Sequence, residues 1–373
     1  MSLQSGVLFA LQTALYFLQS MKFTRFGIWI ILLCALAVPS AKAQIAGISS
    51  LSILDMSLNS RSNALGMDYL SVSDNDFSLT LDNPALIGDW INNNASLNFT
   101  TAFEKANYGS LAYGLKTNRL GAFAIGFRFF NYGRFHGYDE EEVSTGDFFA
   151  ADYVLSVGWG MAIDSNFSFG VNFKPVYSNY DGYTAFAVAF DLAGNYCSDD
   201  KLFSATLMAR NIGKQVVIFD ETFEKVPFEL TAALSYKLKN APFRLFLNLT
   251  ELQKWNLRYE DALNPTSSTD PFTGVVTTQS KGTVFLDNLV RHLQVGVELS
   301  VKKVFYARLG YNYRQMKEVQ SFGNFNAGGF SFGFGLNVKG FDFCYSRNNY
   351  HYGQAPNFIT ITTDLNRFFK KIK

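Results

Sequence analysis

Few side chains in this sequence could act as a catalytic base or a metal ligand. The histidines are His136, His292 and His351. A hydrolytic or acyl-transfer site needs a nucleophile with a base in reach, and none of these histidines has a serine and an acid in a catalytic spacing. The metal-binding spacings HExxH and CxxC do not occur. We therefore expect no enzymatic activity, no metal and no cofactor.

The strand pattern described below places a group of charged residues on the inner faces of a barrel. These residues are Glu229, Lys237, Arg244, Glu298, Arg308, Arg314 and Asp342. Mixed signs favour a network of ion pairs and hydrogen bonds that closes the interior. A permeation path, which is the alternative, would favour rings of one sign. We expect the closing network.

Aromatic and charged residues also occur together in two long connections, as they do on docking surfaces. The candidates for partner contact are Tyr132, Arg134, Tyr138, Trp255 and Phe272. Connections of this length are also ordinary in barrels, so these residues are a hypothesis about partner binding.

The composition limits the class of protein that could position such residues. The chain has 373 residues, of which 48% are hydrophobic and 16% aromatic, too many for a disordered chain. Lys plus Arg number 32 and Asp plus Glu 31, so nothing favours nucleic acid as a partner. Charged residues make up only 17%, yet the mean hydropathy is +0.03. An outer-membrane barrel, apolar outside and polar inside, reconciles these values.

The first residues have the pattern of a secretory signal. The cationic stretch Met21–Arg25 precedes the apolar run Phe26–Val38, and the small residues Ala41 and Ala43 stand before Gln44. We expect Met21 to be the start and residues 1–43 to be an upstream extension and a removed signal. A membrane anchor, the alternative, would need about 20 apolar residues.

Removal of the signal would leave two cysteines, Cys197 and Cys344. Each lies in a strand-like segment, and the two are far apart in the sequence. Spacing alone does not pair them. We expect both to be free and buried.

Alternation with a period of two residues dominates the rest of the chain. In 329–338, Phe330, Phe332 and Phe334 alternate with glycine and serine, and 119–129 and 166–174 behave in the same way. Such alternation is typical of half-buried strands. A soluble sandwich would also alternate, but its outward face would be polar. Here the larger set is aromatic, which favours a wall that faces lipid.

The alternating segments number about fourteen, an even count as in single-chain bacterial barrels. They lie near 94–103, 107–116, 119–129, 148–163, 166–178, 182–195, 202–212, 227–238, 242–253, 288–301, 304–315, 329–338, 341–350 and 357–366. Tight turns follow every second strand, and the long connections 130–147, 213–226, 254–287 and 316–328 lie between the others. Short periplasmic turns and long extracellular loops predict an all-β transmembrane barrel over 94–373 with both termini in the periplasm of a Gram-negative cell.

Residues 44–93 do not follow the strand pattern. Without a core of their own they need a surface to pack on, and we expect a hatch or plug inside the barrel on the periplasmic side. Asn83 and Pro84 predict a rigid turn with Ala85 ahead of the first strand. Arg61, if it lies in the lumen, needs an anionic or carbonyl partner.

The motifs of this segment resemble those of a known family. They are Ser60-Arg61-Ser62-Asn63-Ala64-Leu65-Gly66, a stretch that includes Asp74 and Asp76, and Asn83-Pro84-Ala85-Leu86. They are similar to the N-terminal hatch of the PorQ family of type IX secretion barrels, within the wider group of FadL-like barrels. The resemblance implies that these residues form a hatch motif. It also implies an outer-membrane anchor for the cell-surface attachment complex.

The resemblance implies partners as well. They would be the type IX components PorZ, PorU and PorV, together with outer-membrane lipid or lipopolysaccharide. The alternative function is FadL-like passage of hydrophobic small molecules. An apolar cavity with bound ligand would favour transport, and a dry, charge-paired lumen would favour the anchor.

Overall fold

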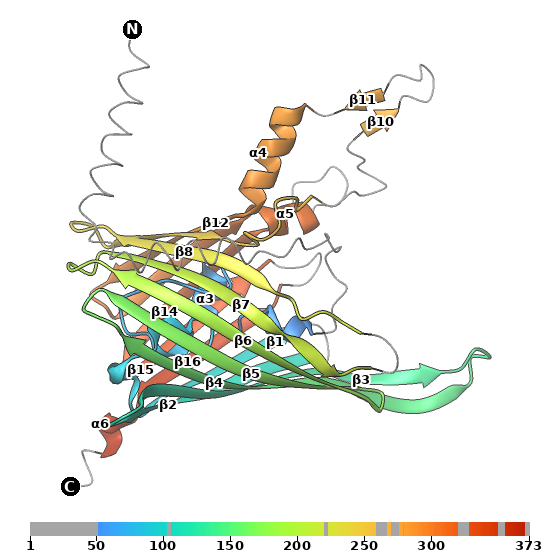
Figure 1. The fold of residues 1–373 in the computed structure, drawn as a ribbon, viewed down its shortest axis with the longest axis horizontal. Coiled ribbons are helices and arrows are strands. Elements are labelled where there is room, and N and C mark those ends of the chain that lie inside the picture. The colour runs from blue at the N-terminus through green and yellow to red at the C-terminus, as the bar shows by residue number, and fades with distance from the viewer. Residues whose placement is uncertain are drawn as a thin grey trace. The chain divides into compact units, whose positions relative to one another are not determined.

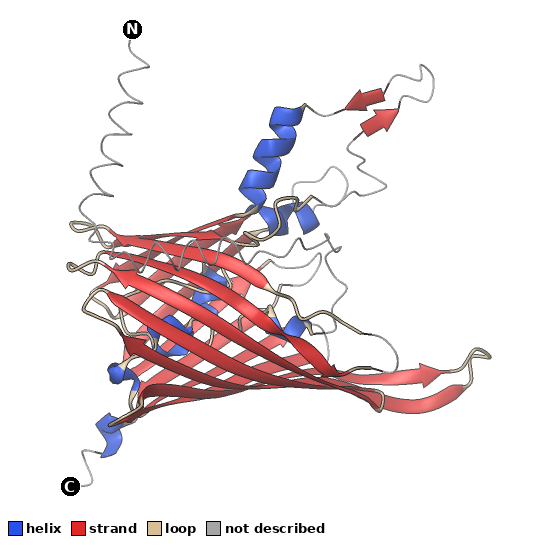
Figure 2. Ribbon diagram, viewed as in Figure 1, coloured by secondary structure: helices blue, strands red, loops and turns tan. Residues whose placement is uncertain are grey.

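The computed structural model of the chain contains a closed antiparallel barrel of fourteen strands (Figures 1 and 2). It describes residues 51–102, 106–219, 223–258, 267–269, 276–278, 280–319, 328–349 and 355–369. The barrel strands are β1 (Asn94–Ala102), β2 (Ala106–Thr117), β3 (Gly121–Tyr138), β4 (Ser144–Ala162), β5 (Phe167–Tyr180), β6 (Tyr183–Cys197), β7 (Phe203–Val217), β8 (Glu229–Lys237), β9 (Phe243–Leu249), β12 (Leu293–Val301), β13 (Phe305–Asn312), β14 (Phe330–Val338), β15 (Phe341–Asn348) and β16 (Asn357–Asp364). Pairing of β1 with β16 closes the barrel. The expected all-β barrel of about fourteen strands is confirmed.

The remaining elements are short. Before the barrel come α3 (Ser60–Ala64) and the 3-10 turns η1 (Ser52–Leu54), η2 (Phe77–Leu79), η3 (Pro84–Leu86) and η4 (Asp89–Ile91). The two-stranded pair β10 (Ser267–Thr269) and β11 (Val276–Thr278) and the helices α4 (Lys281–Arg291), α5 (Tyr313–Val319) and α6 (Asn366–Phe369) complete the structure. Among the described helices none is long and apolar enough to cross a membrane.

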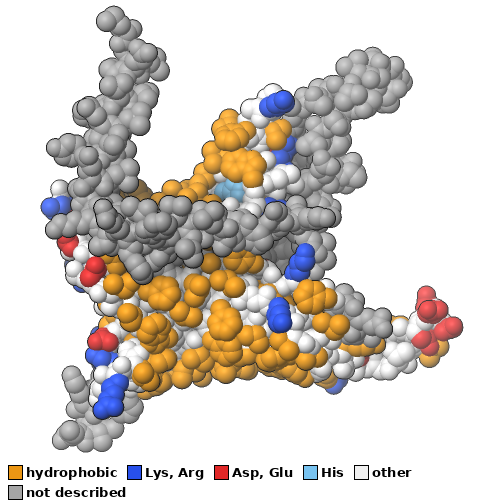
Figure 3. Space-filling view, in the orientation of Figure 1, with side chains coloured by type: hydrophobic (Ala, Val, Ile, Leu, Met, Phe, Trp, Pro, Cys, Tyr) orange, Lys and Arg blue, Asp and Glu red, His pale blue; other side chains and the backbone are white. Residues whose placement is uncertain are grey.

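Apolar side chains cover the outer wall of the barrel. On β14, Phe330, Phe332 and Phe334 are exposed, while the intervening Ser331 is buried on the inner face. Figure 3 shows this apolar surface over the barrel strands. The predicted direction of the alternation, with aromatic residues outward and small or polar residues inward, is therefore confirmed for this strand.

The two ends of the barrel differ. Tight connections join β2 to β3, β4 to β5, β6 to β7, β8 to β9, β12 to β13 and β14 to β15, and we call this side the turn end. The other side, the loop end, carries α4, α5 and the tip of the β3–β4 hairpin. Residues 130–147, expected as a loop, instead continue β3 and β4 with a turn at 139–143. Their ladder continues to Tyr138 opposite Ser144, with bulges that let it twist away from the wall.

Residues 51–93, which we call the lumen segment, contact inward-facing groups of strands on every side of the barrel. The backbone N–H of Ser60 donates to Thr360 of β16, and the amide of Asn248 on β9 donates to the carbonyl of Tyr69. The hydroxyl of Ser168 on β5 donates to the carbonyl of Ala85. The predicted segment begins at residue 44, and residues 44–50 lie outside the described part of the chain, as do the predicted signal and residues 1–43.

Inner-face glycines let the lumen segment approach the wall. A Cβ on Gly310 of β13 would lie 2.0 Å from the backbone carbon of Leu65, and one on Gly170 of β5 would lie 2.1 Å from the carbonyl oxygen of Pro84. No side chain fits at such distances. The small residues of the alternation are therefore required where the segment contacts the strands.

Three other expectations need correction. The strand predicted over 304–315 ends at Asn312, because α5 begins at Tyr313. The connection 254–287 contains β10, β11 and the start of α4. Cys197 and Cys344 are free, as expected, but both are half-buried: Cys197 ends β6, and Cys344 lies in the middle of β15, where its sulfur accepts from Arg308.

Candidate functional site

Arg61 is the centre of an ion-pair cluster inside the barrel. The side chain of Asn59 caps α3 by accepting from the backbone N–H of Arg61, which fixes where the guanidinium leaves the helix. Arg61 Nη2 lies 2.7 Å from Asp74 Oδ2, and Nη1 lies 2.9 Å from Asp76 Oδ2. Nη2 also lies 2.9 Å from Glu298 Oε1 of β12. The guanidinium thus joins two parts of the lumen segment to the wall.

Two further arginines complete this cluster. Arg308 of β13 lies 2.7 Å from Glu298, and Arg244 of β9 lies 2.9 Å from Asp74. Three cations thus face Asp74, Asp76 and Glu298, so every charge at this depth has an opposite partner. Burial of Asp74 by itself raises the pKa of its carboxyl, but Arg61 and Arg244 outweigh that effect and hold the pKa below its usual range.

The lowered pKa of Asp74 predicts a loss of stability in acid. Folding stabilises the ionised carboxylate, so its contribution is complete above the ordinary pKa of 3.8 and is lost as the pH falls through the lower folded value. We expect the fluorescence of Trp90, in a variant without the other tryptophans, to be constant from pH 7 to pH 5 and to change only below pH 3.8. Asp74→Asn should lack this part of the transition. A transition between pH 5 and pH 7 that Asp74→Asn abolishes would contradict this assignment.

A second ion pair lies between the first cluster and the loop end. Arg128 Nη2 of β3 is 2.6 Å from Asp82 Oδ1, and the hydroxyl of Ser57 donates to Asp82 Oδ2 at 2.7 Å. All three residues are buried. This pair ties two distant parts of the lumen segment to one strand.

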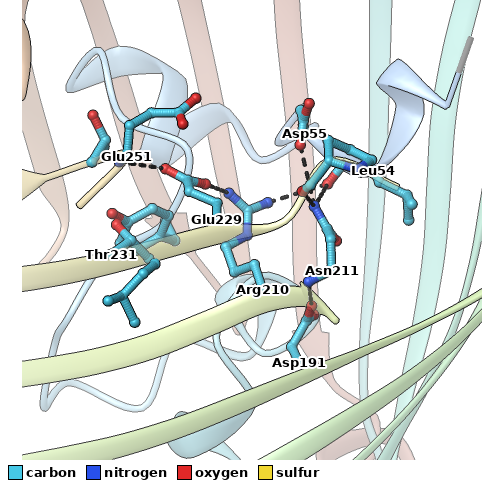
Figure 4. A network of polar contacts seen from close by, with 12 residues as sticks. Leu54, Asp55, Asp191, Arg210, Asn211, Glu229, Thr231 and Glu251 are labelled. Atoms are coloured by element: carbon cyan, nitrogen blue, oxygen red, sulfur yellow. Dashed lines mark hydrogen bonds and ion pairs between the residues drawn. The ribbon is translucent and has the colours of Figure 1, made fainter. Parts of the chain in front are cut away.

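A third cluster surrounds Arg210 of β7 (Figure 4). Its Nη1 lies 2.9 Å from Glu229 Oε2 of β8, and Nη2 donates to the carbonyl of Leu54 at 3.3 Å. Asn211 donates to the same carbonyl and to Asp55. The wall therefore holds the start of the lumen segment by its backbone.

Lys174 of β5 extends this third cluster along the wall. Its ammonium lies 2.6 Å from Asp191 of β6, and Asp191 also accepts the backbone N–H of Asn211. The hydrogen bond from Asn211 occurs where the β6–β7 ladder shifts register. The polar network is thus built around a bulge in the wall.

The loop end of the lumen also contains a large apolar cluster. The wall there contributes Ala106, Tyr108, Phe130, Val154, Val176, Ala187, Ala189 and Val226. The lumen segment places Leu51, Ile53, Leu54 and Leu58 against them. We call this region, which the four side chains of the lumen segment fill, the apolar chamber. Its wall departs from the polar interior that is usual in outer-membrane barrels.

The turn before β1 has the local structure expected from its residues. The side chain of Asn83 accepts from the N–H of Ala85, and Pro84 begins η3. The amide of Asn83 donates to the carbonyl of Leu70 and to Thr206.

Gly66 has φ +68°, a left-handed backbone conformation that favours glycine. Its carbonyl accepts from Asn312 of β13. A glycine is therefore required at this point.

The predicted lumen residues divide into three groups. Glu229, Arg244, Glu298 and Arg308 belong to the clusters above. Lys237 lines a pocket at the turn end, and Asp342 accepts from Asn337. Arg314 does not lie on a strand, because α5 has begun. It pairs with Glu251 and Glu318 at the loop end.

The predicted docking residues are also dispersed. Tyr132 lies on β3, where its hydroxyl donates to Asp152 inside the barrel, so it is not a loop residue. Arg134 and Tyr138 lie on the same strand, and Arg134 pairs with Asp147 at 3.3 Å. Trp255 is half exposed and packs on Phe285 and His292. Phe272 lies outside the described residues.

The histidines have structural contacts where they are described. His136 contacts Asp147 on the β3–β4 hairpin. His292 bonds the carbonyls of Thr250 and Trp255 and so joins the end of β9 to the start of β12. His351 lies outside the described part of the chain.

Sequence reasoning missed the centres of two clusters, Arg210 with Lys174 and Arg128 with Asp82. The alternation places Lys174 and Arg128 on inner faces, which could have identified them. Arg210 lies next to the β6–β7 bulge, where the period of two breaks, and no sequence pattern marks it.

Known proteins resemble the chain in fold. The Pseudomonas putida toluene transporter TodX is 12% identical over 82% of this chain and 96% of its own, with a TM-score of 0.44. The Ralstonia pickettii toluene transporter TbuX is 11% identical over 83% and 98%, with a TM-score of 0.46. A Pseudomonas aeruginosa FadL homologue is 11% identical over 82% and 98%, with a TM-score of 0.44. Identities of 11–12% and TM-scores below 0.5 say nothing about what this chain transports or binds. No family model and no curated protein matches the chain.

Proposed function

We propose that this chain is a non-enzymatic outer-membrane barrel that takes up small apolar compounds through the loop end of its lumen. The observation that carries the proposal is the apolar chamber. Aromatic and aliphatic wall residues such as Tyr108, Phe130 and Val176 line it, and it is the largest of four apolar clusters in the described interior. A chamber of this kind offers a compound with no hydrogen-bonding groups the surroundings that it needs.

The orientation that we propose puts the turn end in the periplasm. Short turns face the periplasm and longer connections the exterior in such barrels. The last barrel strand, β16, ends at Asp364 beside the start of β1, so the C-terminal helix α6 would be periplasmic. We also propose a periplasmic origin for the N-terminus.

Uptake then requires movement of the lumen segment. Leu51, Ile53, Leu54 and Leu58 occupy the apolar chamber, and Arg61 holds the next part of the segment to β12. A compound that enters must displace the first part. For passage to the periplasm, the ion pairs of Arg61 and Arg128 must open as well, or the compound must leave through the wall.

A second function, anchoring of a cell-surface complex of the type IX system, is favoured by a different observation. The ion pairs of Arg61, Arg128 and Arg210 close the lumen with charges that are matched, as a platform without a path would require. The β3–β4 hairpin extends from the loop end and carries exposed acidic residues at its turn (Figure 3). PorZ, PorU and PorV would be the partners in this case.

A disulfide lock separates the two functions. The hydroxyl oxygens of Ser60 on α3 and Ser346 on β15 are 3.2 Å apart, close enough for a cysteine pair to bridge. We expect Ser60→Cys with Ser346→Cys, in a chain with Cys197→Ser and Cys344→Ser, to lose uptake of toluene at least about tenfold when oxidised. Reduction should restore it.

The single variant Ser346→Cys in the same background is the matched control and should be insensitive to oxidant. Uptake that is unchanged by the lock would overturn passage to the periplasm past Arg61, and uptake no greater than in cells without the barrel would overturn transport altogether. If, in addition, a pull-down with the locked, tagged barrel recovers type IX components from the host membrane, the barrel acts as an anchoring platform. Recovery of no such component would remove the platform proposal.

A further inference from the structure

A polar pocket opens at the turn end of the lumen, separate from the apolar chamber. Its volume is about 390 Å³. The lumen segment contributes Ser73, Asp74 and Asn75, and the wall contributes residues of the β6–β7 turn, the ends of β8 and β9, and β12 with its following turn. Four bases and three acids line it: Lys201, Lys237, Arg244 and Lys303, and Asp74, Asp200 and Glu298.

Two of the three acids of this pocket already have cationic partners. Asp74 is held by Arg61 and Arg244, and Glu298 by Arg61 and Arg308. Asp200 accepts from the hydroxyl of Ser198 and from the N–H of Leu202, which shapes its own turn. Asp200 keeps its charge, so one carboxylate that pairs with no cation in the described part of the chain remains against the three lysines.

The lysines do not have such partners. Among the residues that the structure describes, no carboxylate lies within 4.0 Å of the ammonium groups of Lys201, Lys237 or Lys303. Lys237 lies directly opposite Arg244 in the β8–β9 ladder. Like charges in this position destabilise a strand pair. The pocket therefore concentrates positive charge that an anion would relieve.

The chemistry of the bases favours phosphate over carboxylate. The planar fork of arginine suits a carboxylate, but Arg244 already bonds Asp74. Lysines act as point charges, and three of them, two from turns and one from the end of β8, suit the oxygens of a phosphate group. The hydroxyls of Ser300 and Tyr306 also line the pocket. We propose that this pocket binds a phosphate group, presented by a soluble molecule or by a lipid headgroup.

The direct test is titration of the full-length protein in detergent with inorganic pyrophosphate at low salt. We expect Lys237→Gln to weaken binding about tenfold and Lys201→Gln, Lys237→Gln and Lys303→Gln together to abolish it. Lys339→Gln, in the β14–β15 turn at the same end but outside the pocket, should bind as the wild type does. Binding should weaken as salt is raised.

The source of the phosphate is distinguished in nanodiscs. Thermal stabilisation by phosphatidylglycerol over phosphatidylcholine, lost in the triple variant, would indicate a headgroup. Pyrophosphate binding, lost in that variant, would indicate a soluble ligand. The proposal is overturned if the triple variant retains wild-type binding of either probe, if neither probe acts on the wild type, or if citrate binds more tightly than pyrophosphate.

Discussion

Replacing Arg61 with methionine is expected to lower the free energy of unfolding by about 3–5 kcal/mol and to free the lumen segment from the wall. The guanidinium is buried and pairs with Asp74, Asp76 and Glu298 at once. Its removal deprives the buried carboxylate of Glu298 and the partly exposed carboxylates of Asp74 and Asp76 of this partner. Proteolysis of residues 51–93 and single-channel conductance in planar bilayers should both increase, because the lumen is no longer filled.

The exposed ion pair of Lys116 and Asp89 provides the matched control. Its atoms are 2.6 Å apart, as close as those of Arg61 and its partners, but both side chains are exposed. Lys116→Met should therefore cost less than about 1 kcal/mol and leave conductance unchanged. Equal effects of the two substitutions would contradict the role given to burial. A second variant, Arg61→Lys, should keep part of the stability, since it retains one charge.

A single methyl group on Gly310 is expected to be as disruptive. The Cβ of Gly310→Ala would lie 2.0 Å from the carbonyl carbon of Leu65, and backbone cannot turn aside as a side chain can. Overpacking typically costs about 1–3 kcal/mol, and a backbone clash this close belongs at or above the upper end. We expect the barrel to close while the lumen segment is displaced, which protease sensitivity and conductance would report.

The control for this change lies on the outer wall. A Cβ on Gly194 of β6 would meet nothing within 4 Å, so Gly194→Ala should be neutral or slightly stabilising. Gly170→Ala, which meets the carbonyl of Pro84, should behave like Gly310→Ala. A normal, protease-resistant lumen segment in both inner-face variants would show that the segment does not pack as described.

The barrel could be predicted because lipid imposes a pattern on each strand separately. Phe330, Phe332 and Phe334 identify an outward face without any knowledge of neighbouring strands, and the tight turns then fix the strand count. The β3–β4 extension was missed for the same reason. Beyond the membrane the outward face need not be apolar, so residues after Phe129 resemble a loop although their ladder continues.

The candidate site was predictable only in part. A buried arginine such as Arg61 needs acids, and Asp74 and Asp76 are close in sequence. Glu298 is 237 residues away, and its contact depends on how the lumen segment is aligned with β12. Helix α4 has a local sequence signal, because the side chain of Ser280 accepts a hydrogen bond from the N–H of Thr283 and caps the helix. The helix lies in a long connection, however, where no alternating pattern indicates where it begins or ends.

The position of the lumen segment has a consequence for the order of assembly. Ser60 contacts Thr360 of β16, 300 residues later, and β16 also forms the closing seam with β1. The lumen segment therefore cannot complete its contacts until the last strand is in place. Contacts this distant in sequence are slow to form. The sheet can then close around the segment. Deletion of residues 51–93 should therefore impair assembly of the barrel itself, in addition to any effect on transport or docking.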